Sequence, residues 1–139
     1  MRYMGILICA AILVITASSR PAAAHHSFAA EFDGSKSVTF TGKVTKVEWT
    51  NPHAFFYIDV KDEKTGQVAN WAAELNSPNF LMRQGWTRDS MKVDDMVTVN
   101  GSLAKDGSKL LNARTVTLVA SGKRLFAGSS EPTPPPSAK

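Results

Sequence analysis

The three histidines are the side chains of this 139-residue chain whose type and placement most suggest chemistry. His25 and His26 are adjacent, and His53 directly follows an Asn-Pro turn. Cleavage after Ala24 would make His25 the first residue and add its free α-amine to its ring nitrogen as metal ligands. All-nitrogen ligands in a tetragonal array suit Cu(II), which also has the highest affinity in the divalent first-row series. His25, His26 and His53 therefore form a candidate Cu(II) site.

Two observations limit this copper hypothesis. A histidine pair in a polar segment can bind copper weakly without any function. The alternative role of His53 is to form a hydrogen bond within its own turn. Zinc is disfavoured, because three histidines without an evident fourth ligand fall short of a structural zinc site. Cleavage after Ala23 would place His26 third in the chain, where backbone nitrogens also help to bind Cu(II) or Ni(II). No cofactor is otherwise implied.

A second candidate site is aromatic. Apolar residues at 56, 58 and 60 alternate with Phe55 and Tyr57, so these two side chains should point to the opposite face of a strand. Trp49 lies just before this strand, and Arg88 supplies a donor for an anionic or sugar ligand. Phe55, Tyr57, Trp49 and Arg88 are the candidate ligand-binding residues, whereas Trp71 and Trp86 suit a core or its rim.

No arrangement typical of an enzyme is visible. The carboxylates have no spacing that singles out an acid–base pair, and no glycine-rich phosphate loop occurs. Ser27 and Ser77 lack the context of a catalytic triad, and Ser77 is better explained as a helix cap. We expect a protein without catalytic activity.

The first 24 residues have the features of a signal peptide. Arg2 is followed by an uncharged apolar stretch over residues 5–17 and by the small residues Ala22 to Ala24. The stretch is shorter than the roughly 20 residues that a membrane-spanning helix needs, and no later segment is long and apolar enough. We expect export to the periplasm and no transmembrane segment after cleavage.

The only cysteine, Cys9, lies inside this apolar stretch. Lipidation would require a small residue before it, but Ile8 stands there, so an ordinary apolar role is favoured. The mature chain then has no thiol and no disulfide. Removing the two arginines of the leader lowers the net charge from +4 to +2, which disfavours a nucleic-acid surface.

The rest of the chain predicts short strands joined by turns. Alternation from Val38 slips by one residue before Val47, which indicates a β-bulge near Gly42 in a long first strand. Strands are expected over 54–60, 68–75, 96–103 and 111–119, with hairpin turns at 62–66 and 105–108. Ser77 and Pro78 begin a short helix that Gly85 ends, and 124–127 is an optional extra strand.

Three strands, one short helix and two further strands is the order of an OB-fold. The predicted fold is therefore all-β, a five-stranded OB-fold-like Greek-key barrel with one short helix between strands 3 and 4. A five-stranded sandwich is the alternative. The expected organisation is a signal peptide over 1–24, the barrel domain over 25–127 and a disordered proline-rich tail over 128–139.

Several segments resemble a family of small exported bacterial proteins of unknown function. They are His25-His26-Ser27-Phe28, the stretch from Val44 to His53, Asn70-Trp71, Glu74-Leu75, Gly85 to Arg88 and Lys105 to Ser108. The resemblance implies an envelope location and a small β-barrel, but no activity or cofactor.

These observations predict a periplasmic OB-fold-like binding or accessory module. Its ligand or protein partner in the envelope would bind the face of strands 2 and 3, which is the usual binding surface of OB-folds. The alternative is a periplasmic copper-binding protein. Nucleic-acid binding suits the fold but conflicts with export and with the modest charge.

Overall fold

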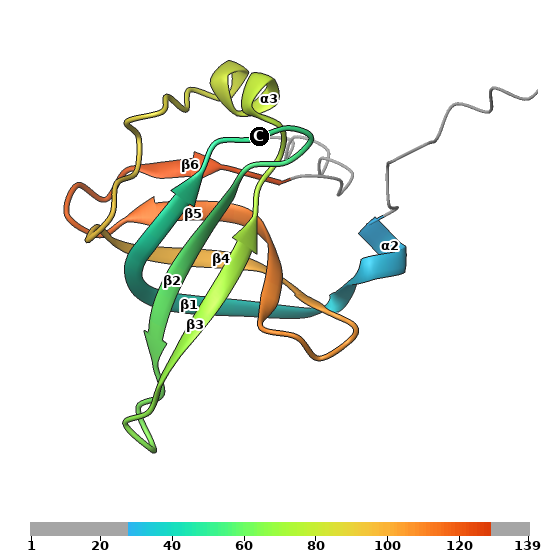
Figure 1. The fold of residues 1–139 in the computed structure, drawn as a ribbon, viewed down its shortest axis with the longest axis vertical. Coiled ribbons are helices and arrows are strands. Elements are labelled where there is room, and N and C mark those ends of the chain that lie inside the picture. The colour runs from blue at the N-terminus through green and yellow to red at the C-terminus, as the bar shows by residue number, and fades with distance from the viewer. Residues whose placement is uncertain (1–27, 129–139) are drawn as a thin grey trace, which may run out of the picture.

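The computed structural model describes residues 28–128. Within them, six strands form one sheet and two short helices flank it (Figure 1). The predicted signal peptide, His25, His26 and the tail beyond Gly128 lie outside the described residues. The elements are α2 (Phe28–Glu31), β1 (Phe32–Glu48), β2 (Phe55–Lys61), β3 (Val68–Glu74), α3 (Pro78–Arg83), β4 (Met96–Ala104), β5 (Leu110–Leu118) and β6 (Arg124–Phe126).

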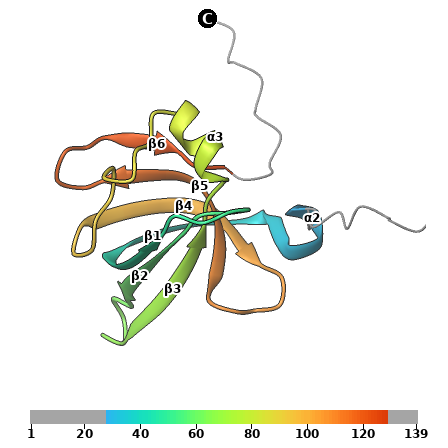
Figure 2. The ribbon, with the colours of Figure 1, turned by 45° about the horizontal axis from the view of Figure 1, so that its top comes forward.

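The sheet closes on itself. Its strand order is β3-β2-β1-β4-β5-β6, with antiparallel neighbours, and β3 also pairs with β5 in parallel from Ala72↔Leu110 to Glu74↔Asn112. The result is barrel-like (Figure 2). This arrangement, with α3 between β3 and β4, confirms the predicted OB-fold-like, mostly β domain. The optional strand near residue 124 is present as β6, which pairs with β5 alone.

Strand β1 is long and bent, as its slipped alternation predicts. It pairs with β4 through residues 37–43 and with β2 through residues 43–48. The register with β2 shifts between Val44 and Lys46, so Thr45 is the extra residue of a bulge. Gly42 lies at the bend, where a methyl group would be 2.5 Å from the carbonyl oxygen of Asp59. Only glycine permits this close approach of β1 and β2.

The start of β1 was not anticipated. Residues 25–37 have no clear hydrophobic period, yet α2 and β1 together occupy residues 28–48. Phe32 explains the difference, because it is 3% exposed and pairs with Ala104 of β4. The pairing is interrupted between Phe32 and Ser37, where the carboxylate of Asp33 accepts hydrogen bonds from Ser35 instead. A tertiary contact therefore determines the strand here.

The core lies inside the closed sheet and under α3. Phe56 and Ile58 of β2 are fully buried, as are the inward side chains of β4 and β5. Leu81 of α3 and Trp86 cover one end of this core, and the indole N–H of Trp86 donates to the carbonyl of Phe126 at 2.8 Å. No helix within residues 28–128 has the length and apolarity to cross a membrane.

The predicted caps and turns are present. Ser77 caps α3 by accepting a hydrogen bond from the backbone N–H of Phe80, and Pro78 is its first residue. Gly85, with φ of +88°, follows its end, and Gly107 has φ of +78° in the β4–β5 hairpin. These positive φ values are costly for other residues, which is why glycine marks both turns.

Candidate functional site

One row of side chains crosses the outside of the sheet. The register pairs Phe55 of β2 with Glu48 of β1 on one side and with Glu74 of β3 on the other, and Glu74 pairs with Asn112 of β5. Because alternate residues of a strand point to opposite faces, these four side chains point away from the core that Phe56 enters. We call the surface formed by this row, by His53 and by the next row the outer face.

The next row contains a charged cluster around Tyr57. Tyr57 pairs with Lys46 of β1, and its hydroxyl donates to Oε2 of Glu48 at 3.0 Å. The ammonium of Lys46 forms an ion pair with Oε1 of Glu48 and lies 5.2 Å from the centroid of the Tyr57 ring. Both oxygens of Glu48 are thus engaged by neighbours on the same face.

These contacts shift the titration of all three groups. The hydrogen bond from Lys46, followed by that from Tyr57, lowers the pKa of Glu48. The hydrogen bond from the Tyr57 hydroxyl to Glu48, together with partial burial, raises the pKa of Tyr57. The hydrogen bond from Lys46 to Glu48 raises the pKa of Lys46. At neutral pH the cluster therefore presents a carboxylate, an ammonium and an uncharged phenol.

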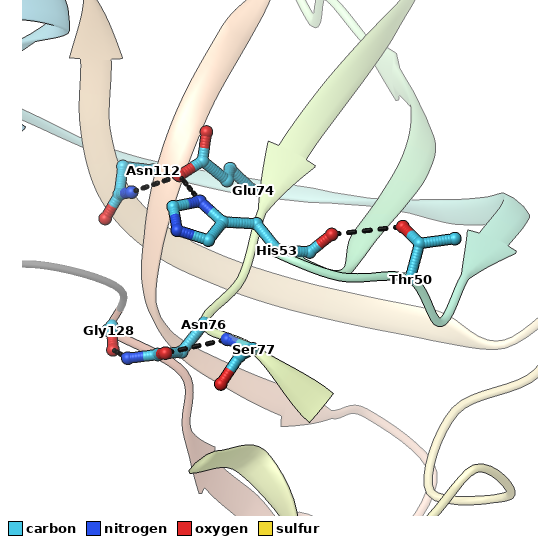
Figure 3. Close-up of polar contacts among 7 residues, drawn as sticks. All are labelled: Thr50, His53, Glu74, Asn76, Ser77, Asn112 and Gly128. Atoms are coloured by element: carbon cyan, nitrogen blue, oxygen red, sulfur yellow. Dashed lines mark hydrogen bonds and ion pairs between the residues drawn. The ribbon is translucent and has the colours of Figure 1, made fainter. Parts of the chain in front are cut away.

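His53 and Glu74 meet at one end of the outer face (Figure 3). His53 Nδ1 lies 2.5 Å from Oε1 of Glu74, and the amide of Asn112 donates to the same oxygen at 3.4 Å. The side chain of Glu74 is 8% exposed, whereas that of His53 is 27% exposed. A buried carboxylate thus holds an imidazole that still reaches solvent.

With Glu74 ionised, the contact favours one position for the proton of neutral His53. An ionised carboxylate only accepts hydrogen bonds, so Nδ1 is the donor, and in the neutral ring Nε2 keeps its lone pair. Nε2 points away from Glu74 (Figure 3) and has no hydrogen-bond partner among residues 28–128. It is available as a metal ligand or as an acceptor for a bound molecule.

Backbone hydrogen bonds hold the His53 turn against the end of β3. The N–H of Ala54 donates to the carbonyl of Asn76 at 3.2 Å, and the N–H of Leu75 donates to the carbonyl of Ala54 at 2.8 Å. The hydroxyl of Thr50 donates to the carbonyl of His53 at 3.1 Å. The turn is thus positioned from both sides, which fixes the imidazole beside Glu74.

The structure brings some of the predicted site residues together and separates others. Phe55 and Tyr57 point outward, as predicted, and are half-buried beside His53. Trp49 instead packs against the core cluster. Arg88 is exposed in the link between α3 and β4, and no contact described for the outer face involves it.

Sequence reasoning did not single out Glu74 and Asn112. Both lie at outward positions of strands whose neighbouring residues are fully buried, yet they are only 6% and 4% exposed. A buried carboxylate and a buried amide at such positions require polar partners. A polar residue between two apolar residues of a strand is the sequence signal that could have identified each of them.

The metal hypothesis depends partly on residues outside the described range. Within residues 28–128, no three histidine, cysteine, aspartate or glutamate side chains come together in a metal-binding group. His53 is the one proposed copper ligand that the structure places, and His25 and His26 lie before Phe28. The Cu(II) site therefore stays a prediction.

Comparison with known proteins supports the resemblance at the level of the family. No curated protein matches the sequence. A family model described as a family of unknown function, DUF6152, matches residues 12–112, which include every strand from β1 to β4 and the start of β5. The chain therefore belongs to this family of unknown function.

Proposed function

We propose that this chain is an exported binding or accessory module that engages a small ligand or a protein partner of the envelope through its outer face. The observation that carries the proposal is the placement of Phe55 and Tyr57. Both aromatic side chains are half-buried on the outside of a sheet whose core is filled by other residues. Half-exposed aromatic rings are typical anchors of binding surfaces.

The polar groups around these rings support a binding role. Glu48 lies beside Phe55 on β1, and the outward nitrogen of His53, which the buried Glu74 holds in place, adds an acceptor. The face therefore combines apolar area with fixed acceptors and with the ammonium of Lys46. Such a surface suits a ligand or partner segment that presents an apolar group beside hydrogen-bond donors.

Quantitative capture from envelope extracts tests the proposal. The tagged mature chain is compared with its Phe55→Ala and Tyr57→Ala variants after cross-linking, with Val119→Ala as the matched control. Val119 is 52% exposed and is not part of the outer face. We expect at least one component of the envelope extract to be captured in equal amounts by the wild type and by the control. The amount captured by each aromatic variant should be at least tenfold lower. Equal recovery with all four proteins would refute the proposal.

A second candidate function is Cu(II) binding through His25, His26 and His53. The observation that favours it is the bond from His53 Nδ1 to the buried carboxylate of Glu74. Histidines that bind metals commonly donate their other ring N–H to a carboxylate, which orients the ring and raises its basicity. Glu74 would thus orient His53 without touching the metal.

Copper titration of the chain that begins at His25 tests this second function. We expect His53→Ala to weaken Cu(II) binding and to change the electron paramagnetic resonance spectrum, because one nitrogen ligand is lost. Glu74→Gln should weaken binding by about 10-fold to 100-fold, as loss of an orienting partner does. An unchanged spectrum in His53→Ala would restrict any copper site to the N-terminal pair and reject the three-histidine site.

A further inference from the structure

A groove with a volume of about 640 Å³ opens near the hairpin that joins β2 to β3. We call it the hairpin-end groove. The hairpin lies at the end of the sheet opposite α3 (Figure 1), and His53 lies at the other ends of β2 and β3. The groove and the outer-face histidine are therefore separate features. Its volume falls within the range of sites that hold small organic ligands, which is about 300–1,000 Å³.

The groove exists because β1 leaves β2. Pairing between these strands begins at Lys43↔Asp59, so Val60 and Lys61 of β2 continue without a β1 partner. The preceding part of β1 turns at Gly42 to pair with β4. Whereas Leu81 and Trp86 cover the opposite end of the core, no helix within residues 28–128 covers this end. Phe40, Val60 and Trp71, which pack against the core and are only partly buried, therefore line the groove at this end.

Two aromatic rings line the groove. Phe40 of β1 and Trp71 of β3 have centroids 4.6 Å apart and planes inclined by 44°. Both are half-buried and pack against the core cluster. Their rings are therefore held in place before any ligand arrives, which reduces the entropy that binding would cost. Flat, fixed rings suit the apolar face of another ring.

The other lining residues provide hydrogen-bonding groups of every kind. Thr41 and Gln67 offer a hydroxyl and an amide, Glu63 a carboxylate, and Lys61 and Lys109 ammonium groups. Acidic and basic side chains are mixed, so the groove has no strong preference for an anion or a cation. A neutral ligand with many hydroxyls satisfies such a rim better than a highly charged one.

We propose that the hairpin-end groove is a binding site for a neutral carbohydrate. A sugar ring has an apolar face that stacks on Trp71 and a periphery of hydroxyls that donate to Glu63 and accept from Gln67 and Lys109. This site is independent of the outer face and of the function proposed for it. An extended peptide along the unpaired edge of β1 is the competing occupant, but the mixed polar rim matches separate hydroxyls better.

Nuclear magnetic resonance of the labelled mature chain tests the assignment. The probes are maltotriose, which carries only hydroxyls, and chitotriose, which adds acetamido groups, each up to about 10 mM, a concentration that detects even weak binding. We expect one probe to shift the indole N–H signal of Trp71 and the backbone N–H signals of Ala69 and Lys109, two further lining residues, in a saturable manner. The two backbone signals measure binding in every variant. Gln67→Ala, an exposed substitution, should weaken binding at least threefold, and Trp71→Phe at least tenfold.

Phe55→Ala is the matched control, because it removes an aromatic ring from the outer face and leaves the groove intact. Sugar binding should be unchanged in this variant. The absence of these shifts with both probes would overturn the proposal. It would also be overturned if the Ala69 and Lys109 signals gave the same sugar affinity in the wild type, in Gln67→Ala and in Trp71→Phe. Shifts at the Thr39 and Thr41 amides with a short valine–threonine peptide, without any response to the sugars, would assign the groove to a peptide instead.

Discussion

His53 Nδ1 and Glu74 Oε1 are 2.5 Å apart although the residues are 21 positions apart in sequence. They meet because β2 and β3 are antiparallel neighbours, so the residues that enter β2 lie beside those that leave β3. The carboxylate is buried and shared with Asn112, which makes it both a structural group and an orienting group for the imidazole.

Glu74→Ala should lower the free energy of unfolding by about 1–3 kcal/mol, since it leaves the buried amide of Asn112 without this acceptor. Urea denaturation measures the change. The exposed Glu63→Ala is the control and should stay within about 0.5 kcal/mol of the wild type. Nitrogen-15 spectra should also show that His53 loses its preference for a proton on Nδ1 in Glu74→Ala. Equal stabilities of the two variants would contradict a structural role of Glu74.

Phe56→Ala and Phe55→Ala should differ strongly in stability. Phe56 is fully buried inside the sheet, so its truncation should cost about 3–5 kcal/mol. Phe55 points to the outer face and is half-buried, and its truncation should cost much less. Urea denaturation of both variants compares the two faces of β2 directly. A loss for Phe55→Ala as large as that for Phe56→Ala would place Phe55 in the core and remove it from the binding face.

Lys46→Met should raise the pKa of Glu48 more than Tyr57→Phe does, because Lys46 is the largest cause of the lowering. The folded pKa lies below the ordinary value of 4.5, so ionised Glu48 stabilises the fold above pH 4.5. That contribution is lost as the pH falls through the lowered pKa. Carbon-13 titration of the carboxyl signals measures the shift in each variant.

Asp62 provides the control for this titration. Its pKa is lowered mainly by the backbone N–H groups of Thr65 and Lys64, which neither substitution changes. The Asp62 titration should therefore be the same in all three proteins. A Glu48 titration that is unaltered in Lys46→Met would show that the ion pair does not persist in solution.

Gly42→Ala should be much more destabilising than Gly66→Ala. A methyl group at Gly42 would meet the carbonyl oxygen of Asp59 at 2.5 Å, so the two strands would have to separate. Gly66 has φ of +73° but open space around it, and its replacement should cost about 1–2 kcal/mol of backbone strain. Thermal melts of both variants test this. Similar melting temperatures would mean that β1 does not approach β2 this closely.

Much of the fold follows from local patterns in the sequence. The alternation in β2, the slip in β1, the Ser77-Pro78 helix start and the Asp-Gly turn each depend on residues close together in the chain. The start of β1 could not be predicted in this way, because Phe32 forms a strand only by pairing with Ala104. The same applies to Trp49, whose packing on the core depends on the path of the chain after β1.

The alternation of apolar and other residues is enough to predict which residues of β2 face outward, since side chains alternate along any strand. The sequence also identified His53 as a turn residue whose imidazole could bind a metal ion. The contacts of Glu74 with His53 and Asn112 could be found only in the folded chain, as could the groove that Phe40 and Trp71 line together. Those contacts join residues that are far apart in the chain. They depend on how the strands pair and where the sheet closes, and no short stretch of sequence contains this information.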